Sequence, residues 1–300
     1  MKHPLIRCPL LLVMLAALSA CSNRQENARI PAPAASAVAE SPAQAADPAK
    51  DPLLAELMRA VFGEKYDTIQ DQAVAELPDF EDRTTISTYA ITPWNHTALP
   101  TGQTLLLANA LMVGDDGHII DSHGTSGLLN LYVLIRQKGQ WKTVKRHDNF
   151  DALGSSGNPG MSRWVQLGAG KTGLAMTHGG SWQGYTIEML SLYDVSNGHV
   201  RNLTPDPIIV HSDNNGWCRP LDSCWDVSGE WKLATVAGAT GYGDLMIEFT
   251  GEKKDPVEGA TEDTPLEITR PAKSVQSHAR YRFDGSTYRL IEGDNPAPSI

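Results

Sequence analysis

The chain has 300 residues, of which 41% are hydrophobic, and its formal net charge at pH 7 is -10. A chain of this length and composition can bury a substantial core in one or two domains. Its negative charge argues against nucleic-acid binding, which needs basic patches that displace phosphate counterions, and it also disfavours direct adsorption to anionic lipid.

The N-terminus has the pattern of an export signal. Lys2 and Arg7 make it positive, and an apolar run from Leu10 to Leu18 follows. This run is too short to span a bilayer as a helix, which takes about 20 apolar residues. Small residues then lead directly to a cysteine, in the order Leu18-Ser19-Ala20-Cys21.

This order resembles the lipobox of bacterial lipoproteins. The resemblance implies that a signal peptide of residues 1–20 is removed and that Cys21 carries diacylglycerol on its sulfur and an acyl chain on its new amino group. Several chains, at about 0.8 kcal/mol per buried methylene, would hold the protein on a membrane essentially permanently. The alternative is an ordinary secretory leader cut after Ala20, which would leave Cys21 as a free thiol.

The residues after the cysteine bear on which membrane carries the anchor. In Gram-negative lipoproteins an Asp at that position usually marks retention in the inner membrane, whereas this chain has Ser22 and Asn23. The resemblance therefore implies attachment to outer-membrane lipid through Cys21, with the protein facing the periplasm by default. Display on the cell surface stays open. Loss of Lys2 and Arg7 with the leader would take the net charge from -10 to -12.

Residues 21–50 are expected to form a disordered tether after the lipidated cysteine. Ala, Pro, Ser and Gln dominate this stretch, and large apolar side chains are nearly absent. Such a composition cannot bury enough surface to offset the entropy of ordering the chain. The tether would lift the folded part away from the membrane.

The other cysteines predict a disulfide. Cys8 leaves with the leader, so Cys218 and Cys224 remain together in an oxidising compartment. A bond that closes so short a loop stabilises the fold by about 2 kcal/mol. The alternative, a two-cysteine metal site, lacks nearby ligands at the spacing of a zinc finger.

The folded part, residues 51–300, is predicted to be a single mainly-β domain that opens with one or two helices. Asp51 suits an N-cap and Pro52 the first helical position. An apolar stripe at helical spacing follows, and Gly63 ends the helix. A second, weaker helix is predicted over residues 67–77, before Pro78.

Beyond Phe80, short strands alternate with turn residues. This spacing favours an antiparallel, hairpin-rich architecture, which could be a barrel, a sandwich or a small propeller-like domain. Residues 252–275 are acidic and contain proline, and a loop insertion is predicted there. The expected strands are residues 85–91, 103–113, 128–136 with 141–146, 164–167 with 174–177, 185–193 with 199–203, 231–236 with 245–249, and 281–283 with 288–290.

Motifs of known enzyme classes fail at particular residues. The serine-hydrolase elbow needs Gly-x-Ser-x-Gly, and the three glycine-rich segments around residues 124, 154 and 179 place the second glycine wrongly. The stretch from Asp213 to Gly216 begins like a calcium loop, but Trp217 stands where an oxygen ligand belongs, and an Asx turn is the better interpretation. We therefore expect no cofactor and no metal, and the sequence favours a non-enzymatic role without deciding it.

Polar and aromatic residues gather instead in loops near the predicted strand ends. If those ends converge, the side chains could share one binding rim, because Trp and Tyr provide large rigid contact area. Each residue also has an ordinary interpretation as a turn Asp, a Trp at the edge of the core or a hydrogen-bonded His. The candidate residues are His123, His178, Trp182, Tyr185, Asp213, Asn214 and Trp217.

Three functions remain open. The first is a noncovalent binding module for a protein or glycan ligand in the envelope, above all a cationic macromolecule. Inhibitors of cell-wall hydrolases and immunity lipoproteins against secreted toxins share its plan of anchor, tether and acidic β domain. The second is an envelope hydrolase that uses the loops of His123 and His178. The third is a structural role in outer-membrane maintenance.

Overall fold

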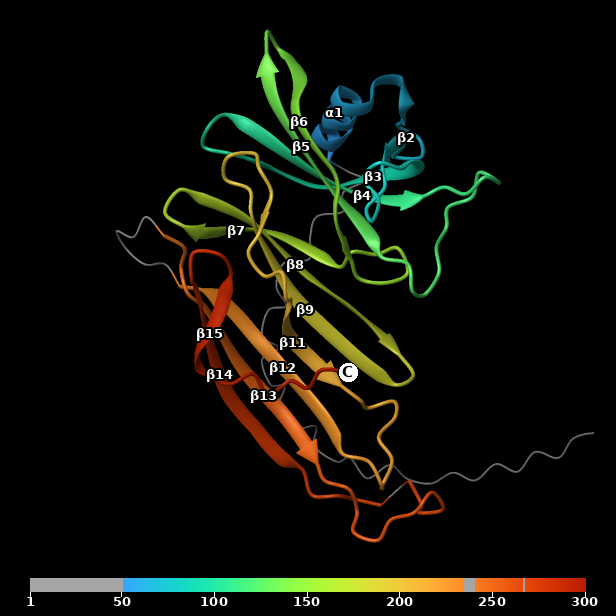
Figure 1. Cartoon of the computed structure of the whole chain (residues 1–300), viewed down its shortest axis with the longest axis vertical. Coiled ribbons are helices and arrows are strands. Elements are labelled where there is room, and N and C mark those ends of the chain that lie inside the picture. The colour runs from blue at the N-terminus through green and yellow to red at the C-terminus, as the bar shows by residue number, and fades with distance from the viewer. Residues whose placement is uncertain (1–50, 235–240, 267) are drawn as a thin grey trace, which may run out of the picture. The chain divides into compact units, whose positions relative to one another are not determined.

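The computed structural model describes residues 51–234, 241–266 and 268–300 (Figure 1). All of them fall within one compact unit, Ala45–Ile300. The predicted signal peptide, Cys21 and the tether lie outside the described residues. Among the residues that are described, no helix is long and apolar enough to cross a membrane.

The described part of the chain begins with one helix, α1, followed by a single 3-10 turn and a six-stranded antiparallel sheet. The strands of this first sheet lie in the order in which they occur along the chain, so each pairs with its neighbours in sequence. The elements are α1 (Pro52–Phe62), η2 (Gly63–Lys65), β1 (Tyr66–Asp67), β2 (Gln72–Pro78), β3 (Ile86–Ala98), β4 (Gln103–Met112), β5 (Gly127–Gln137) and β6 (Gln140–Leu153).

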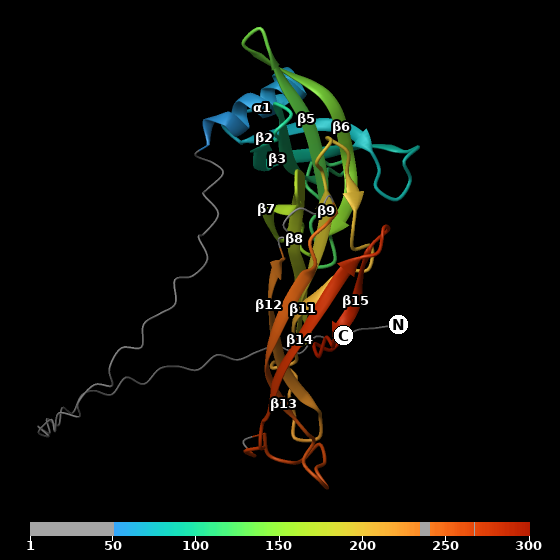
Figure 2. The ribbon, with the colours of Figure 1, turned by 90° about the vertical axis from the view of Figure 1, so that its left-hand side faces the viewer.

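The second sheet has nine strands and is also antiparallel. Its order is β15-β14-β13-β12-β11-β9-β8-β7, and the short β10 pairs with β9 (Figures 1 and 2). Two separate sheets are consistent with a β-sandwich rather than a closed barrel, and the predicted mainly-β, antiparallel fold class is confirmed. The strands are β7 (Met161–Gly168), β8 (Lys171–Trp182), β9 (Tyr185–Asp194), β10 (Arg201–Asn202), β11 (Ile208–Asp213), β12 (Cys224–Leu233), β13 (Leu245–Lys254), β14 (Lys273–Phe283) and β15 (Tyr288–Gly293).

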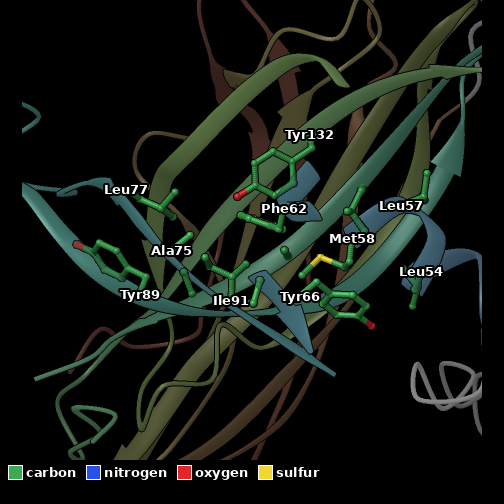
Figure 3. Close-up of a cluster of buried hydrophobic side chains, with 14 of the residues drawn as sticks. Leu54, Leu57, Met58, Phe62, Tyr66, Ala75, Leu77, Tyr89, Ile91 and Tyr132 are labelled. Carbon is green, nitrogen blue, oxygen red and sulfur yellow. The ribbon is translucent and has the colours of Figure 1, made fainter. Parts of the chain in front are cut away.

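The predicted first helix is confirmed, including its ends. The side chain of Asp51 accepts a hydrogen bond from the backbone amide of Leu53, which satisfies one of the unpaired amides of the first turn. Gly63 follows the last helical residue with φ of 60°, a conformation that glycine adopts at little cost. The apolar stripe packs on the first sheet, where the ring of Phe62 meets Tyr132 edge-on (Figure 3).

The predicted second helix is wrong, because residues 72–78 form strand β2. Ala73, Ala75 and Leu77 are buried, whereas Val74 and Glu76 between them are exposed. This alternation has the period of two residues that a half-buried strand requires. The strand pairs with β3 and completes the surface on which α1 packs.

The two sheets share a buried layer of aliphatic side chains. Leu105 and Leu107 of β4 belong to the same cluster as Leu174 and Met176 of β8 and Tyr193 of β9. A further cluster lies among the strands of the second sheet, from β7 to β15. The second sheet therefore contacts the first through β8 and β9 and has a core of its own beyond them.

The loop predicted over residues 252–275 is shorter than expected. Strand β13 continues to Lys254 and β14 begins at Lys273, so residues 255–272 make the connection. Glu252, Lys253 and Lys254 are charged, and this polar end concealed the strand in the sequence. The ladder between β13 and β14 runs from Lys253 paired with Lys273 to Leu245 paired with Tyr281 (Figure 2).

The outer strand of the first sheet, β6, is partly covered by one side chain. The guanidinium of Arg83 donates hydrogen bonds to the backbone carbonyls of Asp148, at 2.8 Å, and Asn149, at 3.0 Å. Arg83 comes from the turn before β3, and so it ties that turn to the far edge of the sheet.

Candidate functional site

Two connections that are distant in the sequence meet at one end of the second sheet (Figure 1). The β8–β9 turn is formed by Gln183 and Gly184, with φ of 52° and 83°, as in the tight hairpin turns that require two left-handed residues. The backbone amide of Gly216, in the β11–β12 connection, donates to the carbonyl of Gly184 over 3.1 Å. A Cβ atom on Gly184 would lie only 2.4 Å from the carbonyl carbon of Gly216, so the close approach requires glycine.

Three of the predicted residues place aromatic rings around this contact, and we call them the aromatic surface: Trp182, Tyr185 and Trp217. Trp182 and Trp217 keep 49% and 43% of their surface exposed. Tyr185 is half-buried, with its ring centroid 6.0 Å from that of Trp225. The indole nitrogen of Trp225 donates to the hydroxyl of Ser212, and this hydrogen bond holds the ring that packs against Tyr185. Large apolar groups that stay in water at a loop end are typical of contact sites.

Asn214 and Asp213 hold the β11–β12 connection in one conformation. The buried Asn214 accepts a hydrogen bond from the amide of Trp225 and donates one to the carbonyl of Ser223, each of 2.9 Å. Asp213 accepts from the amide of Asn215, which confirms the expected Asx turn. Asn214 is therefore placed to position the connection, and its side chain is not part of the exposed surface.

The predicted disulfide between Cys218 and Cys224 is present. One guanidinium nitrogen of Arg270 lies 2.8 Å from both sulfurs, and the other donates to the carbonyl of Asp222. Arg270 belongs to the long β13–β14 connection, so it couples that segment to the disulfide. Sequence reasoning missed this residue because nothing near it in the chain indicates which loop it meets.

Charged side chains of both signs lie on the strands and the connection that carry the aromatic surface. Asp213, Asp226 and Glu252 lie directly opposite one another on β11, β12 and β13. Because side chains alternate along a strand, these carboxylates point to the face of the sheet opposite to Trp182, Tyr185 and Trp225. Glu252 also forms an ion pair with Lys254. The guanidinium of Arg219 lies over the ring of Trp217 and forms an ion pair with Asp222.

The two predicted histidines are in different environments. A ring nitrogen of His123 lies 3.0 Å from the carbonyl of Ser181, which brings the β4–β5 connection next to Trp182. His178, although on the same strand as Trp182, is only 5% exposed and contacts the hydroxyl of Ser191. Burial lowers the pKa of His178. The structure therefore brings His123 to the aromatic surface but not His178.

A metal site and a ligand cavity are two other kinds of site that a protein could form. Within the described parts of the chain, no three His, Cys, Asp or Glu side chains are grouped so that they could hold a metal ion. A cavity of about 390 Å³ lies between β15 and the segment before β11, and none of the seven candidate residues lines it. Its titratable side chains include Asp206 and Arg289, with aliphatic and aromatic residues around them. The cavity therefore does not explain the exposed tryptophans.

No protein-family model, no curated protein and no solved structure matches this chain. Its function must therefore be argued from its own residues. The fold and the site define a two-sheet β protein with an exposed aromatic surface next to a disulfide.

Proposed function

We propose that this protein is a lipid-anchored binding module whose aromatic surface captures a cationic macromolecule of the cell envelope. The observation that carries the proposal is the exposure of Trp182, at the end of β8, and of Trp217, in the β11–β12 connection, next to the contact between Gly184 and Gly216. Tryptophan and tyrosine are over-represented among residues that dominate binding energy. Keeping two of them in water on one braced surface is best explained by a partner that covers them.

The bracing favours tight binding. The disulfide, the buried Asn214 and the hydrogen bonds of Arg270 hold the β11–β12 connection before any partner arrives. A surface that is already ordered loses little conformational entropy on association. The affinity gained from burying the two indole rings is then largely retained.

The charge of the chain supports a basic partner. The whole chain has a formal net charge of -10, and Asp213, Asp226 and Glu252 form a row of carboxylates on the opposite face of strands near the aromatic surface. Opposite charges steer encounter and raise the association rate, and the effect weakens as salt screens it. A basic hydrolase or toxin, inhibited by a protein anchored through Cys21 to the outer membrane and facing the periplasm, fits this chemistry.

The experiment compares partner capture by matched variants. Soluble full-length mature protein with Cys21→Ala is used as bait for envelope extracts and secreted basic proteins, alone and with Trp182→Ala or Trp217→Ala. The control is Ile69→Ala, which removes a 96% exposed apolar side chain from the β1–β2 turn. We expect either Trp variant to weaken the complex by about 2 kcal/mol, or about 30-fold in Kd, and the control to leave it unchanged. Equal capture of the partner by all variants would show that the aromatic surface is not part of the binding interface.

The environments of His123 and His178 give less support to the hydrolase alternative, which depends on these two residues. Ser191, the hydroxyl beside His178, is 1% exposed, so a substrate could not reach it without rearrangement. His123 uses a ring nitrogen to contact a backbone carbonyl. Turnover of an envelope substrate that His123→Ala or His178→Ala abolishes would reverse this preference. A structural role in outer-membrane maintenance would be favoured if no partner is captured and loss of the protein makes the envelope leaky.

A further inference from the structure

We propose that Ser228 is a nucleophilic serine, activated by His211 and Asp213, that accepts an acyl group from an ester. The hydroxyl of Ser228 lies 2.9 Å from Nδ1 of His211, and Nε2 of the same ring lies 3.0 Å from a carboxylate oxygen of Asp213. A hydroxyl, an imidazole and a carboxylate in series are the arrangement that activates serine in acyl transfer.

Strand register brings the three residues together. His211 of β11 is directly opposite Ser228 of β12, and these strands are neighbours in the second sheet (Figure 1). Asp213 is two residues beyond His211, so both side chains lie on the same face of the sheet. The Asx turn of Asp213 onto the amide of Asn215 fixes one carboxylate oxygen and leaves the other for the histidine.

The carboxylate determines which histidine nitrogen carries the proton. An ionised Asp213 can only accept a hydrogen bond, so Nε2 of His211 must donate to it. In an imidazole with its proton on Nε2, Nδ1 is the acceptor, and it lies 2.9 Å from the hydroxyl of Ser228. This is the tautomer that a general base needs in order to remove the serine proton.

Solvent exposure distinguishes the group of Ser228, His211 and Asp213 from the pair of Ser191 and His178. Ser228 is exposed on the open face of β12, whereas Ser191 beside His178 is buried. His211 and Asp213 are largely covered, with side chains 22% and 14% exposed. An accessible hydroxyl above a shielded base and carboxylate is suited to react with a molecule from solution.

The reaction can be written in full. The Oγ of Ser228 attacks the carbonyl carbon of the ester while its proton passes to Nδ1 of His211. The bond from that carbon to the leaving oxygen breaks, and the histidine returns the proton to the departing alkoxide. The products are an acyl-Ser228 ester and a free alcohol. The backbone of β12 here is paired with β11 and β13, so its amides are committed to the sheet rather than free to stabilise an oxyanion. We therefore expect activated esters to acylate Ser228 and the acyl group to remain.

The test uses p-nitrophenyl acetate as the acyl donor and full-length mature protein. Peptide mapping by mass spectrometry reports acetylation of Ser228 and of Ser274, an exposed serine on the same face of β14. Among the described residues, no histidine hydrogen-bonds to Ser274, so it reports the reactivity of an ordinary surface serine. We expect Ser228 to react about 100-fold faster than Ser274, as general-base catalysis allows. Equal rates in the wild-type protein would overturn the proposal, and this comparison needs no variant to fold.

Two variants then separate the roles of the partners. His211→Gln should lower acetylation of Ser228 to the level of Ser274, because the base is lost. Asp213→Asn should also lower it, because an amide can donate to Nε2 and so reverse the tautomer. An unchanged rate in His211→Gln would contradict the proposal. Ile69→Ala, which removes an exposed side chain from the β1–β2 turn of the first sheet, should leave acetylation unaffected.

Discussion

Gly184 and Gly216 are joined by one backbone hydrogen bond of 3.1 Å, and neither position has room for a side chain. This contact links the β8–β9 turn directly to the β11–β12 connection by backbone atoms, close in the chain to Trp182 and Trp217. The geometry of the aromatic surface therefore depends on two residues that carry no side chain.

Gly184→Ala should destabilise the protein more than Gly139→Ala. The two glycines occupy equivalent hairpin turns with the same φ of 83°, so both variants bear the cost of a left-handed alanine, about 1 kcal/mol. A Cβ at position 139 meets nothing within 4 Å, whereas one at 184 collides with Gly216. We expect a further loss of about 2 kcal/mol for Gly184→Ala, measured by urea unfolding. Equal losses would show that the two connections can separate freely.

Loss of the disulfide should loosen two segments more than it lowers global stability. In Cys218→Ser with Cys224→Ser, the free energy of unfolding should fall by about 2 kcal/mol, because the closed loop is short. Hydrogen exchange should rise in residues 214–223 and also in 255–272, because the guanidinium of Arg270 loses its contacts with the two sulfurs. Faster exchange throughout the second sheet would instead mean that the bond supports the whole core.

Acid should weaken the fold through His178. Burial holds the pKa of His178 below its ordinary value of 6.5. As the pH falls through 6.5, the unfolded chain gains a proton on this residue and the folded chain does not, so stability decreases. In His178→Gln, the slope of unfolding free energy against pH below 6.5 should be smaller by up to about 1.4 kcal/mol per pH unit. His147 is shifted in the same direction by burial, so part of the slope should persist. An identical slope in the variant would show that His178 does not contribute to the pH dependence of stability.

Cys21→Ala should release the protein from the membrane fraction. The lipobox resemblance implies that Cys21 is acylated, and among the described residues no helix is long and apolar enough to cross a membrane. Fractionation followed by a salt wash measures the change, with Cys8→Ala as a control that alters only the leader. A Cys21→Ala variant that stays in the washed pellet would contradict the lipoprotein hypothesis.

Local patterns were sufficient for most of the fold. The predicted strands over residues 128–136 and 141–146 correspond to the β5–β6 hairpin, and Asp51 with Gly63 marked the ends of α1. The wrong secondary-structure prediction occurred where the residue composition and the spacing of the apolar residues indicate different structures. Residues 67–77 contain several helix-favouring residues, but Ala73, Ala75 and Leu77 form a buried face only with the period of a strand.

The site was less predictable, because its parts meet through pairing between distant strands. Trp182, Tyr185 and Trp217 could be chosen as loop aromatics, but their support by Trp225 depends on the order of β9, β11 and β12. His211 and Ser228 are likewise brought together by register, and nothing in either segment indicates the other.

The two hydrogen bonds from Arg83 to the carbonyls of Asp148 and Asn149 also affect how copies of this protein meet one another. Exposed sheet edges are templates for aggregation. The guanidinium covers two carbonyls of β6, and the exposed Lys142 on the same strand adds a charge of the kind that protects an edge. A strand from a second copy would therefore meet cationic side chains along β6 instead of a bare row of backbone groups.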